Sequence, residues 1–253
     1  MNNDITLLDE LTANKIAAGE VAESPVSIVK ELIENSIDAG ASQITVEIRD
    51  GGKSLIKVSD DGYGIKPDQI ELAFTRHATS KIRSIEDFQR LNTNGFRGEA
   101  LSSIASVSKI DIVTNISSDA IGVRATFIDS KVTEISPAGA RRGTTVSVMD
   151  LFYNTPARKK FLRPGNREAL SIIDIVTRLA IINTKIRFKL ISDGKEVIST
   201  DGDGISLNAI RTLYGKNLAS NLIKTSFSNE YISIEGYISN TSLYASNRKK
   251  QNI

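Results

Sequence analysis

The chain has 253 residues and a formal net charge of +2, with 40% hydrophobic and 25% charged residues, ordinary values for a soluble globular protein. It has no cysteine and one histidine, His77, which excludes disulfides, thiolate zinc sites, cysteine nucleophiles and mechanisms that need two histidines. No apolar run of transmembrane length and no signal-peptide pattern is present, so we expect neither a membrane protein nor a secreted one. The remaining chemistry suits phosphate transfer with magnesium.

The small net charge hides two oppositely charged parts of the chain. Residues 1–100 hold 17 acidic and 11 basic side chains, whereas residues 141–189 hold 11 basic and 3 acidic ones. This division predicts two surfaces, one for a metal and one for an anionic polymer.

The first strong helix signal runs from Pro25 to about Ala39. Ser24 is a good N-cap, proline suits the first helical position, and glycine follows the last turn. Alternating apolar residues then predict strands at 44–48 and 55–59, joined by a glycine turn. Another helix is expected to begin at Pro67, and a polar, weakly periodic stretch follows it.

The second half of the chain begins with a predicted helix from Glu99 to about Ser106. Four alternating segments then predict an antiparallel meander, a long helix is expected over about 167–182, and two strands follow it. The six strands are expected at 109–115, 121–129, 131–136, 143–150, 186–192 and 195–199. Residues 201–204 predict a linker between one domain over 1–200 and the start of a second over 205–253, which is too short for a core of its own.

The polar face of the first helix gathers three carboxylates and an amide. At about 100° per residue, Glu31, Asn35 and Asp38 fall close together, with Glu34 beside them. One interpretation is a solvated surface opposite the apolar stripe. The other is functional, because Glu31 and Asn35 lie one turn apart and place a candidate base beside an oxygen ligand for magnesium.

Two glycine-rich loops follow this helix. Asp60-Asp61-Gly62-Tyr63-Gly64 fits a plain turn, or a carboxylate that accepts a hydrogen bond from an exocyclic amine beside glycines that admit a flat ring. The stretch 95–101 fits an ordinary helix cap, or a phosphate cradle made of backbone N–H groups and the helix dipole. No GxxxxGK[ST] string is present, so a Walker-type site is excluded.

Taken in order, the acidic helix, the DxGxG loop, the polar stretch, the glycine loop and a late Gly143-Thr144-Thr145 resemble the GHKL ATPases, which have the Bergerat nucleotide fold. Longer strings resemble the MutL family of DNA mismatch-repair proteins within that class, across essentially the whole chain, and disfavour a chaperone or topoisomerase subunit. These strings are IAAGEV (16–21), KELIENSIDAG (30–40), RHATSK (76–81), GFRGEAL (95–101) and DLFYNTPARKKFL (150–162).

The resemblance implies a fold and two cofactors, ATP and Mg²⁺. The fold is an α/β sandwich with helices on one face of a mixed, mostly antiparallel sheet, followed by an incomplete domain similar to ribosomal protein S5. A lid is expected over about 75–98, with His77 in a structural role. Glu31 matches the family's general base, Asn35 its magnesium ligand and Asp60 the carboxylate that recognises the adenine amino group. The other expected nucleotide-binding residues are Asp38, Gly64, Thr79, Ser80, Lys81, Gly95, Phe96, Arg97, Gly98 and Thr144.

The basic stretch 158–167 holds five cations in ten residues. It fits a solvated turn, or a contact with the DNA backbone that is independent of sequence and weakened by salt. The resemblance favours DNA contact, because MutL proteins bind DNA. The candidate residues are Arg158, Lys159, Lys160, Arg163 and Arg167.

The resemblance implies a slow ATPase switch, in which ATP orders the lid, associates two N-terminal regions and relays mismatch detection by a MutS-type partner. In this family the second domain continues beyond the point at which this chain ends and adds a lysine to the γ-phosphate, so we expect ATP binding with weak turnover. The alternative is a DNA-binding scaffold that uses nucleotide only for structure. Cytoplasmic, nucleoid-associated placement is expected in a bacterium, and nuclear placement in a eukaryote.

Overall fold

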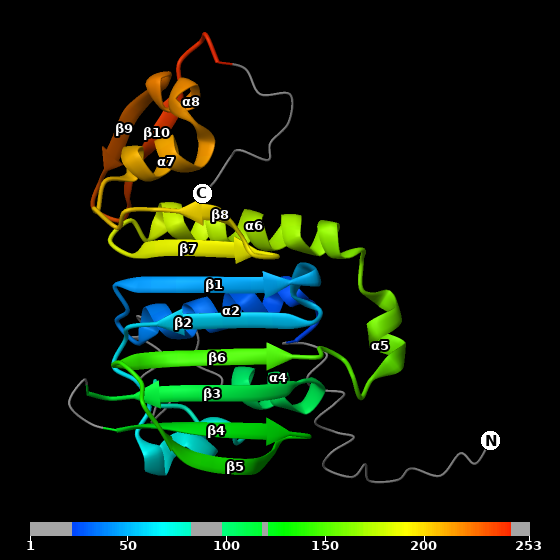
Figure 1. Ribbon diagram of the computed structural model, residues 1–253. Coiled ribbons are helices and arrows are strands. Elements are labelled where there is room, and N and C mark those ends of the chain that lie inside the picture. The colour runs from blue at the N-terminus through cyan, green and yellow to red at the C-terminus, as the bar shows by residue number, and fades with distance from the viewer. Residues whose placement is uncertain (1–21, 82–97, 118–120, 244–253) are drawn as a thin grey trace.

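One large sheet organises the molecule. The computed structural model describes residues 22–81, 98–117 and 121–243. Eight strands lie in the order β5-β4-β3-β6-β2-β1-β7-β8 (Figure 1). β1 and β7 pair in parallel, and the other neighbouring strands pair antiparallel. The strands are β1 (Gln43–Arg49), β2 (Leu55–Asp60), β3 (Lys109–Asn115), β4 (Gly122–Ile128), β5 (Lys131–Ala138), β6 (Gly143–Met149), β7 (Arg187–Ser192) and β8 (Lys195–Ser199).

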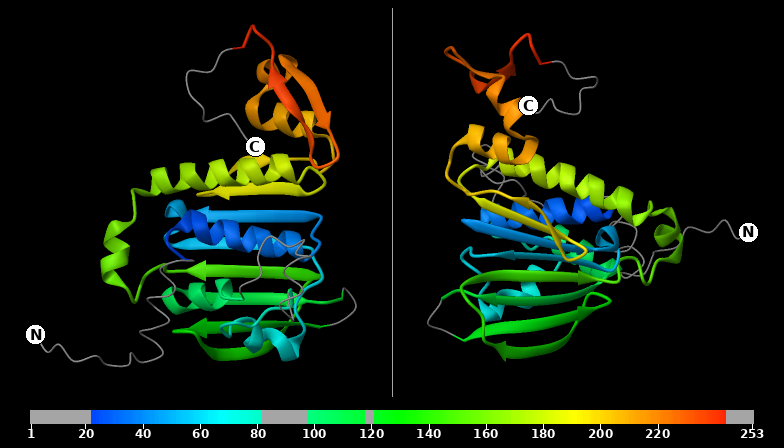
Figure 2. Two further views of the ribbon diagram at one scale, coloured as in Figure 1. Left: turned by 180° about the vertical axis from the view of Figure 1, so that it is seen from behind. Right: turned by 45° about the horizontal axis from the view of Figure 1, so that its top comes forward.

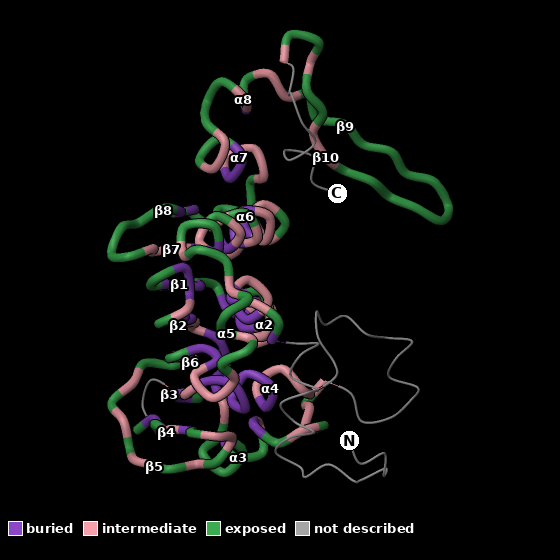
Figure 3. The backbone as a smooth tube through the Cα atoms, turned by 90° about the vertical axis from the view of Figure 1, so that its right-hand side faces the viewer, coloured by how far each residue is buried: buried purple, intermediate pink, exposed green. Residues whose placement is uncertain are grey.

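Three helices cover one face of this sheet, α2 (Pro25–Asp38), α4 (Ala100–Val107) and α6 (Gly165–Ile182). Seen edge-on, they lie on the same side of the strands (Figure 3). The predicted α/β sandwich, with helices on one face of a mixed, mostly antiparallel sheet, is therefore confirmed.

The core forms between the helices and the sheet because apolar residues alternate along the strands. In β1 the side chains of Ile44, Val46 and Ile48 are fully buried, while the residues between them are not. The same alternation runs through the neighbouring strands and meets the apolar side of α2, which includes Leu32. Burying each large aliphatic side chain contributes roughly 1.5–3 kcal/mol, so this interface holds the helix in place.

Helix α2 begins and ends as its sequence predicts. The Ser24 hydroxyl accepts a hydrogen bond from the backbone N–H of Ser27 at 3.4 Å, and Pro25 occupies the first turn. At the other end Gly40 has a φ of +67°, which lets the chain turn into β1. The polar face of α2 is thereby fixed relative to the ends of β2 and β6.

The predicted four-strand meander is wrong in its last strand. β3, β4 and β5 are consecutive neighbours, but β6 lies between β3 and β2. The connection from β5 passes the end of β3, where the Asn115 side-chain amide donates to the Ala140 carbonyl at 2.8 Å. Alternation predicts which face of a strand is buried but not which strand lies beside it, and this return brings β6 next to β2.

Several short elements join the larger ones. They are the 3₁₀ turns η1 (Asp50–Gly52) and η2 (Pro67–Gln69) and the helices α3 (Ile70–Ala73) and α5 (Pro156–Phe161). The glycine turn after β1 and the helical start at Pro67 were expected, whereas α5 was not. α6 begins at Gly165, slightly before the expected start.

The C-terminal part contains helices α7 (Ser206–Tyr214) and α8 (Lys216–Ser220) and the hairpin of β9 (Leu222–Ser228) and β10 (Ser233–Ser239). α7 lies against α6, with Ala209 and Ile210 buried, and the hairpin extends away from the large sheet (Figures 1 and 2). The division into two domains with a linker at 201–204 stays a prediction. Within the described residues, no helix is long and apolar enough to cross a membrane.

Candidate nucleotide-binding site

Asp60 lies at the end of β2, where three elements meet. Its Oδ1 accepts hydrogen bonds from the backbone N–H groups of Gly62 at 2.9 Å and Thr144 at 3.2 Å. Its Oδ2 accepts a hydrogen bond from the Ser36 hydroxyl on α2 at 2.8 Å. Asp60 and Thr144 face each other in the β2–β6 register, so the return of β6 brings together two residues that are 84 positions apart.

Burial raises the pKa of the Asp60 carboxyl above its ordinary value. The hydrogen bonds from Ser36, Gly62 and Thr144 oppose this rise, because they stabilise the charged form, and the neighbouring Asp61 charge adds to it. Asp61 behaves in the opposite way. Its carboxylate binds the Ser42 hydroxyl at 2.5 Å and two backbone N–H groups, which hold its pKa below the usual range despite desolvation.

The loop after Asp60 is held against β3 by a hydroxyl. Thr114 Oγ1 accepts from the Ile65 backbone N–H at 2.9 Å and lies 3.0 Å from Thr144 Oγ1. Gly64 has a φ of +73°, and a Cβ there would lie 2.2 Å from the Asn115 carbonyl oxygen. The loop therefore needs glycine for its own packing against the backbone of β3, in addition to any space for a ring.

Two oxygens on the polar face of α2 converge on one cation. The Lys81 ammonium donates to Asn35 Oδ1 at 3.1 Å and to Asp38 Oδ2 at 2.5 Å. The Asp38 side chain is only 6% exposed, so its ion pair with Lys81 is largely shielded from water. Glu31 lies one turn before Asn35 on the same helix and is half-buried.

These contacts test whether the residues fit magnesium. An amide oxygen and a carboxylate oxygen are hard ligands of the kind that Mg²⁺ prefers, and here they already hold a positive charge. Asn35, with Asp38 nearby, therefore fits the expected cation site.

The segment that enters the expected lid is tied to the start of α4. His77 Nδ1 lies 3.2 Å from Glu99 Oε1, and an Arg76 nitrogen lies 3.7 Å from the same oxygen. Gly98 has a φ of +64° and packs on the backbone of Ala78. These contacts place residues 76–78 beside Gly98 and Glu99, directly before α4, and the structural role of His77 stays a prediction.

The described residues bring six of the expected nucleotide-site residues into two groups. Asp60, Gly64 and Thr144 form one group, and Asn35 and Asp38 of α2 form another with Lys81. Thr79 Oγ1 accepts from the Lys81 backbone N–H at 3.1 Å, whereas Ser80 is exposed. Gly95, Phe96 and Arg97 lie outside the described residues, as do 82–94 of the expected lid.

Two contacting residues were not predicted from the sequence, Ser36 and Thr114. Ser36 directly follows Asn35, and the only signal was a serine on the apolar side of an amphipathic helix. Thr114 lies in a strand where threonine is common, so nothing in its pattern singled it out.

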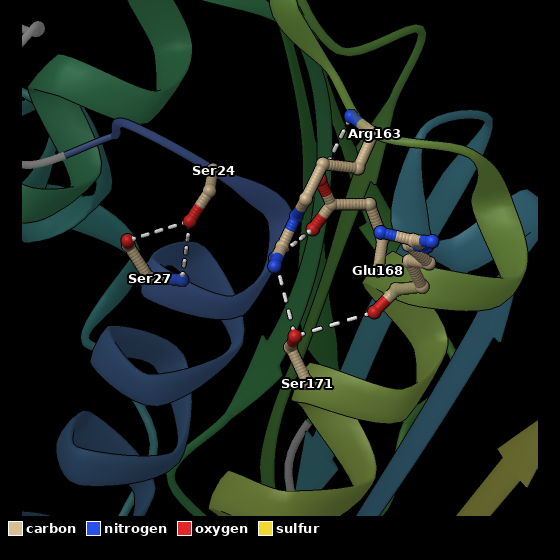
Figure 4. A network of polar contacts seen from close by, with 6 residues as sticks. Ser24, Ser27, Arg163, Glu168 and Ser171 are labelled. Atoms are coloured by element: carbon tan, nitrogen blue, oxygen red, sulfur yellow. Dashed lines mark hydrogen bonds and ion pairs between the residues drawn. The ribbon is translucent and has the colours of Figure 1, made fainter.

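The basic stretch 158–167 contains two arginines that bind other groups of the protein and three cations that are exposed. The Arg158 guanidinium stacks on the Phe152 ring, 4.3 Å from its centroid, and donates to the Ala22 carbonyl at 2.5 Å. Arg163 binds Glu168, whose side chain is 2% exposed, and also reaches Ser171 (Figure 4). Lys159 and Lys160 on α5 and Arg167 on α6 are exposed.

Comparisons with known proteins agree with this geometry. The family model described as histidine kinase-, DNA gyrase B- and HSP90-like ATPase matches residues 23–145. The DNA mismatch repair protein MutL of Clostridium tetani (strain Massachusetts / E88) is 51% identical over 98% of this chain, and that of Clostridium acetobutylicum is 49% identical over the same share. The chain spans 40% of the length of each of these relatives.

Solved structures give the same result. The N-terminal domain of a DNA repair protein superposes with a TM-score of 0.80 and 27% identity, covering 94% of this chain and 75% of that one. The Aquifex aeolicus MutL ATPase domain complexed with ADP has a TM-score of 0.66 and 29% identity, covering 81% and 72%.

The fold and the arrangement around Asp60 define a GHKL-class ATPase domain. Within that class the chain belongs to the MutL family and corresponds to its N-terminal ATPase region.

Proposed function

We propose that this chain binds ATP with magnesium, hydrolyses it slowly and serves as the nucleotide-driven switch of a DNA mismatch-repair protein. The observation that carries the proposal is the Asp60 carboxylate, which two backbone N–H groups and a hydroxyl hold at the junction of α2, β2 and β6. Two comparisons support the proposal. The similar Aquifex MutL ATPase domain is complexed with ADP, and the bacterial relatives are DNA mismatch repair proteins.

Asp60 is the base-recognition group of the proposed site. A carboxylate only accepts hydrogen bonds, so it pairs with an exocyclic amino group and repels a carbonyl oxygen. Thr144 lies beside it, and Gly64 belongs to the loop that follows. This arrangement selects adenine over bases that carry oxygen at the equivalent position.

The polar face of α2 takes the phosphate end of the nucleotide. Asn35 would hold magnesium, with Asp38 close to it, and Lys81, which now binds these two oxygens, would then be available to phosphate. Bound magnesium withdraws charge from the phosphate oxygens. Thr79, Ser80 and Gly98, with Gly95, Phe96 and Arg97, supply further donors to the phosphate chain.

Glu31 acts as the general base of the proposed reaction. Its carboxylate orients a water molecule towards the γ-phosphate and accepts a proton from it. Placement on a buried helix one turn from Asn35 keeps the base and the phosphate-binding end in a fixed relation. A base held in this way supports hydrolysis of bound ATP, and slow hydrolysis is what a switch requires.

ATP binding and hydrolysis drive a conformational cycle. ATP orders the lid and the N-terminal segment, two N-terminal regions associate, and hydrolysis separates them again. The cycle relays mismatch detection by a MutS-type partner, and exposed cations of the basic segment hold DNA through its backbone. In a bacterium the protein acts in the cytoplasm, where its DNA lies.

Glu31→Ala separates an ATPase from a scaffold that binds nucleotide without catalysis. We expect this variant to bind ATP like the parent chain and to lose hydrolysis, measured by phosphate release. Glu34→Ala is the matched control, because Glu34 lies on the same helix but pairs with Lys30 at 3.2 Å. Unchanged phosphate release in Glu31→Ala would favour the scaffold.

A further inference from the structure

The Ser36 hydroxyl is buried between α2 and the Asp60 carboxylate. The residue is 3% exposed, and its Oγ lies 2.8 Å from Asp60 Oδ2 and 3.1 Å from the Leu32 carbonyl oxygen of its own helix. A hydroxyl carries one proton, so it donates to only one of these acceptors at a time. The carboxylate is the shorter and charged partner, and a hydrogen bond to a charged acceptor is the stronger one.

Among the described residues, the hydrogen bonds around Asp60 leave one acceptor direction open. Oδ1 already accepts from the backbone N–H groups of Gly62 and Thr144, which use both of its lone pairs. Oδ2 accepts from Ser36, which leaves a single lone pair. Ser36 therefore fixes the carboxylate rotation together with the two N–H groups, and it alone determines which lone pair of Oδ2 remains.

We infer that Ser36 is a positioning residue for base selection, which orients Asp60 Oδ2 towards the amino group of adenine and against purines that carry oxygen there. The inference rests on the proposed ATP site and adds the residue that sets its specificity. Ser36 touches the carboxylate and acts on the base only through it.

The same hydroxyl favours the charged form of Asp60, which rejects guanine. A protonated carboxyl is a donor and would pair with the guanine carbonyl oxygen, whereas the carboxylate cannot. Burial and the Asp61 charge raise the pKa of Asp60, and Ser36 is the strongest of the groups that oppose them. The other groups that bind this carboxylate, the N–H groups of Gly62 and Thr144, are uncharged, and the Asp61 carboxylate is engaged with Ser42 and Gln43.

The test compares ATP and GTP binding, with magnesium, in the parent chain and in Ser36→Ala between pH 5 and 8. We expect Ser36→Ala to lose about tenfold in its preference for ATP over GTP, the size of one hydrogen bond. We also expect its ATP affinity to fall off at a higher pH than in the parent. Protonation of the nucleotide itself affects both proteins equally, so it does not change the difference between them at any one pH.

Two further substitutions separate positioning from a loss of structure. Ser106→Ala is the matched control, since Ser106 is also buried but donates to the Ser103 carbonyl of its own helix at 2.8 Å. It should keep both the ATP preference and the pH profile. Ser36→Thr, which retains the hydroxyl, should keep the parent's preference, and Ser36→Cys, a weaker donor, should fall between the parent and Ser36→Ala.

The outcomes distinguish this inference from the proposed function. A folded Ser36→Ala chain with the parent's ATP preference and pH profile would overturn the role of Ser36 while leaving the ATP site intact. Absence of ATP binding by the parent chain would instead overturn the proposed function, and this inference with it.

Discussion

The Lys81 ammonium lies where a bound cation would meet Asn35 and Asp38. The two cannot occupy the same place, so a metal ion has to displace Lys81 from these oxygens. Lys81 therefore stabilises these two oxygens, and at the proposed site it would compete with magnesium for the same ligands.

Replacing Lys81 by methionine should expose this competition. Removing the ammonium takes a close ionic partner from the nearly buried Asp38, so we expect a lower Tm than the parent in the absence of divalent ions. Added Mg²⁺ should raise the Tm of Lys81→Met more than that of the parent, measured by thermal melting. Lys30→Met, which removes an exposed pair on the same helix, is the control. An equal response to Mg²⁺ in all three chains would argue against a cation site at Asn35.

Asp60 and Asp61 should affect stability in opposite directions. The raised pKa of Asp60 means that folding disfavours its charged form, so its unfavourable effect on stability appears as the pH rises from 3.8 towards the folded value. Asp60→Asn should then be at least as stable as the parent at pH 7, with a smaller difference at pH 4.5. The lowered pKa of Asp61 means a favourable contribution that is present above 3.8, so Asp61→Asn should be less stable at pH 7.

Urea unfolding at the two pH values measures both effects. A large loss of stability in Asp60→Asn at pH 7 would contradict this expectation. It would mean that the hydrogen bonds of the Asp60 carboxylate stabilise the fold by more than its burial destabilises it.

At the scale of elements, α5 carries two of the exposed cations proposed to contact DNA, and Arg167 on α6 is a third. Lys159 and Lys160 are exposed on α5, whereas Arg163 is bound to the buried Glu168 and Arg158 to Phe152 and Ala22. We expect the double variant Lys159→Ala/Lys160→Ala to weaken DNA binding. It should also reduce the slope of log affinity against log salt by about 2, because two phosphate contacts are lost.

Arg163→Ala provides the contrast, since it should lower the Tm by leaving Glu168 without its guanidinium partner. Binding to duplex DNA at several salt concentrations, together with thermal melting, distinguishes the two roles. If the double lysine variant keeps the parent's salt slope, α5 is not the DNA-binding surface.

Sequence patterns predicted where individual helices and strands lie in the chain better than which strands lie side by side in the sheet. α2 was predicted closely, because a cap, a proline, an apolar stripe and a terminal glycine all agree in one short segment. The place of β6 was missed, since alternation carries no information about strand order. The short helix α5 was missed because its basic, exposed residues show no apolar periodicity.

At the scale of the molecule, the site forms from segments far apart in the chain. The resemblance to the GHKL ATPases predicted Asp60, Asn35 and Thr144, and the β2–β6 pairing explains how two of them meet. Ser36 lies within the family string 30–40, but its contact with Asp60 crosses the helix–sheet interface and could not be predicted from the string. The proposed base recognition therefore depends on the assembled fold rather than on one loop.

Calorimetric titration with ATP, with and without Mg²⁺, on the parent chain and on Asp60→Asn tests the account most directly. The parent should bind ATP in a magnesium-dependent manner. Asp60→Asn should fold but lose this binding, because an amide N–H₂ in place of Oδ2 would face the amino group of adenine. Equal ATP binding by the two proteins, or no binding by the folded parent chain, would contradict the assignment of the site.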